Sequence, residues 1–123
     1  MKLKALQLAA MIKAGKAMAE ADRNVDNEEV ALIAQEVLMH SVPKKGLNDI
    51  FDLAEQMPVP SMFSTLAEMS DEKKKYVCGF LAAVMAANGE VAEAEVSVWR
   101  LIATLAKFPE MTLEQAIDYW KEH

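Results

Sequence analysis

Apolar residues recur every three or four positions along almost the whole chain, with polar residues between them. This spacing is typical of amphipathic α-helices, and no stretch shows the convincing alternation of a half-buried β-strand. The first helix is predicted to bury one face: Leu8, Met11, Ile12, Gly15, Met18 and Ala19. Gly15 within this face predicts a close approach by another helix, although a glycine in mid-helix costs about 1 kcal/mol relative to alanine.

A second helix is expected to begin at Asp26. Its side chain can accept hydrogen bonds from the first-turn amides, while Glu29, three positions later, reaches back to complete a capping box. Four apolar residues are predicted to form the buried face of this helix: Val30, Ile33, Ala34 and Val37. His40 lies at the end of the helix, where a cation interacts favourably with the helix dipole. We expect this role for His40 rather than catalysis.

Two short helices are expected in the middle of the chain. Residues 43–46, Pro-Lys-Lys-Gly, form a turn signal. Asn48 or Asp49 can then cap a helix that ends at Pro58 and Pro60. The apolar residues of this helix are Ile50, Phe51 and Leu53. The next helix is predicted to run through Met62, Phe63, Leu66 and Met69.

Three further helices complete the expected architecture. The fifth opens at residues 70–72, Ser-Asp-Glu, and the uncharged stretch after Lys75 indicates that it is central and the most enclosed. The sixth, closed by Pro109, carries Val96, Val98, Trp99, Ile102, Leu105 and Ala106. In the last helix Thr112 and Gln115 resemble a capping box. Its apolar face consists of Leu113, Ala116, Ile117 and Trp120. The sequence therefore predicts a single all-α domain, residues 1–123, of about seven helices.

Two parts of the chain, about 3–40 and about 71–107, look alike at an offset of 66 residues. Five pairs of identical residues coincide: Ala17 and Ala83, Ala21 and Ala87, Val25 and Val91, Glu29 and Glu95, Val30 and Val96. Each part consists of an apolar helix, a polar turn, one valine expected to be buried at the corner, and acids that oppose the dipole of the next helix. The pattern predicts an internally duplicated helix pair.

The charge and cysteine content exclude several classes of protein. A net charge of −6 argues against nucleic-acid binding, because phosphate contacts need a surface rich in lysine and arginine. The single cysteine, Cys78, cannot form an intramolecular disulfide, and its uncharged surroundings predict a small core residue. No apolar run approaches the 18 or more residues of a transmembrane helix, and the N-terminus fits an amphipathic helix better than a signal peptide. We therefore expect a cytoplasmic protein.

The chain contains no motif of a known catalytic or nucleotide-binding site. One cysteine and two histidines cannot supply the usual ligands of a zinc site. We therefore expect no enzymatic activity. Nine methionines, together with Trp99 and Trp120, are expected in the core first and on an adaptable binding surface second. Such a surface would suit a protein partner or a weak homodimer.

The turn 22–29 is the densest array of oxygen ligands in the chain. Asp22, Asn24 and Asp26 match the first, third and fifth positions of an EF-hand loop. The match fails afterwards, because Asn27 replaces the glycine at the sixth position and Ile33 replaces the bidentate glutamate at the twelfth. Two interpretations stay open: a looser Ca²⁺ or Mg²⁺ site built from both parts, or acids that serve only helix caps and dipoles.

Residues 84–95, Val-Met-Ala-Ala-Asn-Gly-Glu-Val-Ala-Glu-Ala-Glu, resemble the signature of the TerB-like domains, which are named for tellurite-resistance proteins. Asn88 stands where these domains usually have aspartate. Residues 21–29 resemble the paired element, with Arg23 in place of glycine. The resemblance implies an all-α domain of this size with an internal duplication. It also implies a non-enzymatic interaction module of bacterial stress and tellurite-resistance systems.

A metal-binding feature formed by acids of both turns is a further implication of the resemblance. The corresponding residues are Asp22, Asp26, Glu29, Glu90, Glu93 and Glu95. Asn88 and Ala92 depart from the family pattern and weaken a site in the second turn. The alternative function to an interaction module is therefore a sensor of Ca²⁺ or Mg²⁺ that uses these turns.

Overall fold

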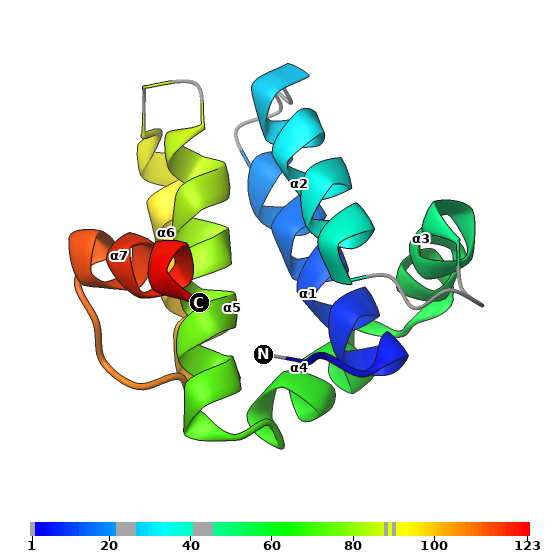
Figure 1. Ribbon diagram of the computed structural model, residues 1–123. Helices are drawn as coiled ribbons and strands as arrows, with labels where there is room; N and C mark the ends of the chain where they lie inside the picture. Colours follow the sequence, from blue (N-terminus) through cyan, green and yellow to red (C-terminus); the bar gives the residue numbers. More distant parts are fainter. Residues whose placement is uncertain (1, 22–26, 41–45, 88, 90) are drawn as a thin grey trace.

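A computed structural model describes residues 2–21, 27–40, 46–87, 89 and 91–123 (Figure 1). Within these ranges there are seven helices and no strand. The helices are α1 (Ala5–Ala19), α2 (Asn27–His40), α3 (Leu47–Gln56), α4 (Val59–Ala67), α5 (Asp71–Ala86), α6 (Glu93–Leu105) and α7 (Leu113–Glu122). The prediction of a single all-α domain of about seven helices is confirmed for the described residues.

α1 and α5 form the centre of the molecule. Figure 1 shows α2 and α3 beside α1, α6 and α7 beside α5, and α4 at one end between the two groups. All six residues predicted for the buried face of α1 are buried. Every residue of α5 from Tyr76 to Met85 is buried as well, which confirms the expectation that this helix is the most enclosed. None of the described helices is long and apolar enough to span a membrane.

Two glycines allow helices to pack closely: Gly15 of α1 against α5, and Gly79 of α5 against α7. A Cβ atom at Gly15 would lie 3.0 Å from Cε2 of Phe80, which confirms the predicted close approach of a neighbouring helix. A Cβ atom at Gly79 would lie 2.6 Å from Cβ of Trp120 and would also overlap the carbonyl oxygen of Ala116. α5 and α7 therefore approach each other so closely that only glycine fits at position 79 without a shift of α7.

The buried face of α2 differs from the prediction. Ile33 and Val37 are buried as expected, but Val30 is 51% exposed. Glu29 and Glu36 are buried instead, each with 1% of its surface exposed. Residues 29, 33, 36 and 37 follow the helical period and share one side of α2. Val30 comes one residue after Glu29, so its side chain is rotated by about 100° from that of Glu29. The predicted face was wrong because it contained apolar residues only. Glutamate is rarely fully buried unless it is paired, so the pattern gives no reason to place Glu29 and Glu36 inside.

The ends of the short helices also differ from the prediction. α3 ends at Gln56, before Pro58, and Pro60 stands in the first turn of α4 instead of ending α3. Proline fits there because the first-turn amides of a helix have no partner within the helix. Met69, expected in the fourth helix, lies beyond the end of α4 at Ala67.

α6 ends four residues before Pro109. The backbone amides of Lys107 and Phe108 donate to the carbonyl oxygens of Thr104 and Ala103, and Lys107 has a φ of 58°. This is the Schellman arrangement, in which a left-handed residue stops the helix.

The corner valine Val91 is 41% exposed, so its predicted burial was wrong. The other corner valine, Val25, and the predicted start of the second helix at Asp26 lie outside the described residues.

The helix starts repeat along the chain. α1 and α5 begin 66 residues apart, at Ala5 and Asp71, and α2 and α6 begin at the same separation, at Asn27 and Glu93. The third residue of α2 is Glu29 and the third residue of α6 is Glu95. Both side chains are buried, with exposed fractions of 1% and 2%. The offset of the helix starts thus equals the offset at which the two parts of the sequence look alike.

Candidate functional site

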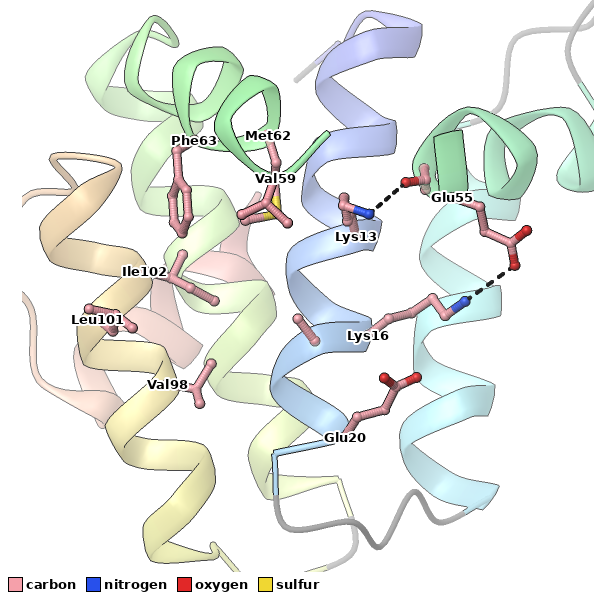
Figure 2. Close-up of a pocket in the computed structure, with 12 residues that line it drawn as sticks. Lys13, Lys16, Glu20, Glu55, Val59, Met62, Phe63, Val98, Leu101 and Ile102 are labelled. Carbon is pink, nitrogen blue, oxygen red and sulfur yellow. Dashed lines mark hydrogen bonds and ion pairs between the residues drawn. The ribbon is translucent and has the colours of Figure 1, made fainter. Parts of the chain in front are cut away.

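A groove of about 310 Å³ opens on the surface between α1, α3, α4 and α6, and we call it the α1–α6 groove (Figure 2). Its apolar side comes from α4 and α6 and consists of Val59, Met62, Phe63, Val98, Leu101 and Ile102. Its charged side comes from α1 and α3 and consists of Lys13, Lys16, Glu20 and Glu55, with Ala17 and Ala54 between them. Mostly apolar clefts with a few polar groups are the usual form of a ligand site, and this volume lies at the small end of their range.

The apolar side of the groove reaches from the surface into the core. Val59 and Leu101 are 53% and 56% exposed, and they line the same groove, and contiguous exposed apolar side chains, unlike single ones, can mark a binding site. Met62 and Ile102 are both 3% exposed and belong to the core. An apolar group placed in the groove would therefore cover exposed side chains and extend the core outwards.

The charged side of the groove carries two ammonium groups, one helical turn apart on α1. Nζ of Lys13 donates a hydrogen bond to the carbonyl oxygen of Ala54 over 3.2 Å. Nζ of Lys16 lies 3.7 Å from Oε1 of Glu55, whose side chain is 68% exposed. Exposed pairs of this kind contribute little to stability, so Lys16 can exchange Glu55 for another anion at small cost. Among the described residues, no carboxylate pairs with Lys13.

A second group of polar side chains lies where α2, α5 and α7 meet, and we call it the Glu36 cluster. The buried carboxylate of Glu36 accepts hydrogen bonds from the hydroxyl of Tyr76 and from Nε1 of Trp120, both over 2.9 Å. Nε2 of His40 lies 2.8 Å from the Tyr76 hydroxyl and 3.2 Å from Oε2 of Glu36. Because Tyr76 donates its single proton to Glu36, we assign Nε2 of His40 as the donor to the Tyr76 oxygen.

The Glu36 cluster is suited to holding helices together. Burial, followed by the charge of Glu36, raises the pKa of Tyr76 above its ordinary value, so its hydroxyl stays protonated and keeps donating. Networks whose members satisfy one another fix a single packing arrangement. His40 is the last residue of α2, where the sequence placed it, but its contact with Tyr76 spans 36 residues and no local pattern indicates it.

Cys78 is a core residue, as the sequence predicts. Its side chain is 2% exposed, and Nε1 of Trp99 donates to its backbone carbonyl oxygen over 3.1 Å. Burial raises the pKa of the thiol to about 11, so the thiolate that would act as a nucleophile is scarce at neutral pH. Trp99 is 7% exposed and is therefore a core anchor.

Three of the six residues predicted to bind Ca²⁺ or Mg²⁺ fall in the described part of the chain. Glu29 and Glu95 are buried, whereas Glu93 is exposed at the start of α6. Asp22, Asp26 and Glu90 lie outside the described residues. Within the described ranges, no three or more histidine, cysteine, aspartate or glutamate side chains come together to hold a metal ion. The cation site stays a prediction, since half of its residues are not described.

No protein-family model matches the chain, and no curated protein matches it. A solved structure does: the crystal structure of PG1108, a protein of unknown function from Porphyromonas gingivalis W83, is similar with a TM-score of 0.84. The two sequences are 29% identical, and the match covers 98% of this chain and 92% of that one. The arrangement of helices is thus similar over nearly the whole length of both proteins, while the function of PG1108 is unknown.

Proposed function

We propose that the protein is a non-enzymatic interaction module that holds an apolar group of its partner in the α1–α6 groove. The observation that carries this proposal is the pair Val59 and Leu101, which are more than half exposed above the buried Met62 and Ile102. Burying apolar surface contributes about 25 cal/mol per Å², so an apolar group has a favourable place here.

The chemistry of the described side chains supports a binding role rather than a catalytic one. The groove offers two lysines and two glutamates, and its lining includes no histidine, cysteine, serine or threonine. Nucleophilic catalysis usually needs an activated nucleophile beside a base. Cys78 is buried with a raised pKa. In the Glu36 cluster, the hydroxyl of Tyr76 and Nε1 of Trp120 donate to the carboxylate of Glu36 itself.

The groove can be tested with a neutral apolar probe. Octanol titrated into the protein should shift the methyl NMR signals of Val98, Leu101 and Ile102, which line the groove. Leu101→Arg should abolish these shifts. Leu6→Arg is a matched control, because Leu6 is 58% exposed, like Leu101, but does not line the groove. Absent shifts in the wild-type protein, or equal losses in both variants, would contradict the proposal.

The resemblance to TerB-like domains and the internal duplication belong to the same proposal. They are supported by the helix starts, which repeat at 66 residues in both helix pairs. We propose that the protein serves a bacterial stress response, tellurite resistance included. A strain that lacks the gene should then grow less well than its complemented control in the presence of tellurite. Equal growth would contradict a role of the protein in tellurite resistance and would leave the groove proposal intact.

Divalent-cation sensing is the second candidate. It is favoured by the positions of Glu29 and Glu95, which are buried at the third residue of two helices that each follow an acidic turn. Binding should raise the thermal midpoint in millimolar Ca²⁺ or Mg²⁺ relative to EDTA, because ligand at 100 times its Kd adds about 2.7 kcal/mol. The double variant Asp22→Ala plus Asp26→Ala should lose this shift. An identical midpoint in both conditions would exclude the sensor.

A further inference from the structure

We infer that the α1–α6 groove takes a medium-chain aliphatic carboxylate, with the alkyl chain against Met62 and Ile102 and the carboxylate at Lys13 and Lys16. The inference rests on the proposed function, because it names the chemistry of the group that the groove holds. Three features of the groove carry it: its volume, the elements that form its walls, and its charge.

The volume of the groove matches a short chain better than a fully enclosed turn of helix. One turn of an α-helix with its side chains is about 10 Å across and 5.4 Å long, which corresponds to roughly 420 Å³. The groove holds about 310 Å³, less than a single such turn. At roughly 30 Å³ for each small group, about the liquid volume of one water molecule, it accommodates a chain of around ten atoms.

The walls favour an alkyl chain over an extended peptide. All lining residues belong to helices, apart from Glu20, which caps the end of α1. The backbone groups of helices are largely used in their own hydrogen bonds, and the carbonyl oxygen of Ala54 already accepts from Lys13. A peptide would bring backbone N–H and C=O groups that need partners, and burying them without partners is costly. An alkyl chain has no such groups.

The charges favour an anionic head group. An ammonium group has three N–H donors, and Lys13 donates to Ala54 alone among the described residues. Within the described part of the chain, Lys16 has only the loose, exposed pair with Glu55. Figure 2 shows Lys13 and Lys16 next to each other along α1, with Glu20 at the far end of the charged side. A carboxylate at the Lys13 end thus lies beside two cations and away from Glu20, and it replaces the exposed carboxylate of Glu55 as the partner of Lys16.

Three eight-carbon probes with different head groups test the inference by methyl NMR on the full chain. Octanoate should bind about tenfold more tightly than octanol, because hydrogen bonds to charged groups are worth more than neutral ones. Octylamine should bind more weakly than octanol. Octanoate should bind roughly 15-fold more tightly than hexanoate, since each buried methylene raises affinity about fourfold.

The lysines are tested by substitutions that keep the aliphatic stem. Lys13→Met and Lys16→Met should each reduce the preference for octanoate over octanol severalfold, with octanol affinity retained as evidence of an intact groove. Lys121→Met is the control, because Lys121 is exposed on α7 away from the groove, and it should change neither affinity.

The outcomes separate this inference from the proposed function. Octanol shifts at the groove without any preference for octanoate would overturn the inference and leave the interaction module standing. A preference for octanoate that survives both lysine substitutions would also overturn it. If neither octanol nor octanoate shifts the groove methyls of the wild-type protein, the proposed function fails as well. A peptide that shifts these methyls when octanoate does not would identify a protein segment as the occupant instead.

Discussion

Nε1 of Trp120 donates a hydrogen bond to Oε1 of Glu36 over 2.9 Å and thereby joins α7 to α2 across 84 residues of the chain. Tyr76 of α5 donates to the same carboxylate, so one buried acid connects three helices. A carboxylate that is 1% exposed is tolerated only when donors surround it. The Glu36 cluster should therefore contribute more to stability than the exposed ion pair between Lys16 and Glu55.

Replacing the carboxylate of Glu36 by an amide tests this role. Glu36→Gln should lower the free energy of unfolding by about 2–3 kcal/mol. The new NH₂ group must face Tyr76 or Trp120, both of which donate hydrogen bonds to the carboxylate. Urea denaturation followed by far-UV circular dichroism measures the loss. Glu55→Gln makes the same change on an exposed side chain and should alter stability by less than about 0.5 kcal/mol. Equal effects of the two substitutions would contradict a structural role for the cluster.

Local signals in the sequence were sufficient to predict most of the helices. The apolar period places α1 and α5, and the capping box of Thr112 and Gln115 is present with both hydrogen bonds, 3.1 Å and 3.0 Å long. These signals act over three or four residues, so they can be read directly from the chain. Gly15 could also be interpreted, because its position in an apolar face has few explanations other than close packing.

The Glu36 cluster and the groove could not be predicted in the same way. Glu36 interrupts the apolar pattern of α2, and its partners lie 40 and 84 residues away, so the pattern predicts an exposed acid. The groove draws its lining from four helices, and the apolar pattern predicted for α6 does not include Leu101, which lines it. Which apolar residues stay exposed is decided by tertiary packing, which a helical period does not encode.

The packing of α5 against α7 gives a second prediction. Gly79→Ala should lower the free energy of unfolding by about 2–3 kcal/mol, because the added methyl group meets the backbone of Ala116 and Cβ of Trp120 rather than a flexible side-chain end. Urea denaturation measures the loss, and hydrogen exchange should show weaker protection in α7. Gly46→Ala, which adds the same methyl group to open space, should change stability by less than about 1 kcal/mol. Unchanged stability of Gly79→Ala would refute the close approach.

The start of α7 gives a third prediction. The hydroxyl of Thr112 accepts a hydrogen bond from the backbone amide of Gln115 over 3.1 Å. Thr112→Ala leaves this amide without its cap and should cost about 1 kcal/mol in urea denaturation. Thr112→Ser keeps the hydroxyl and should retain most of the stability. If serine and alanine have the same effect, the capping hydrogen bond does not contribute.

The buried thiol of Cys78 predicts a loss of stability at alkaline pH. Burial raises its pKa from 9.0 to about 11, so between these values the unfolded thiol is ionised while the folded one keeps its proton. The unfolded state then binds fewer protons, and the free energy of unfolding falls as pH rises, by up to about 2.7 kcal/mol. Urea denaturation at pH 8 and pH 11 should show this extra loss in the wild-type protein but not in Cys78→Ala. Tyr76 titrates in both proteins, so it cancels in the comparison, and equal losses would contradict the raised pKa.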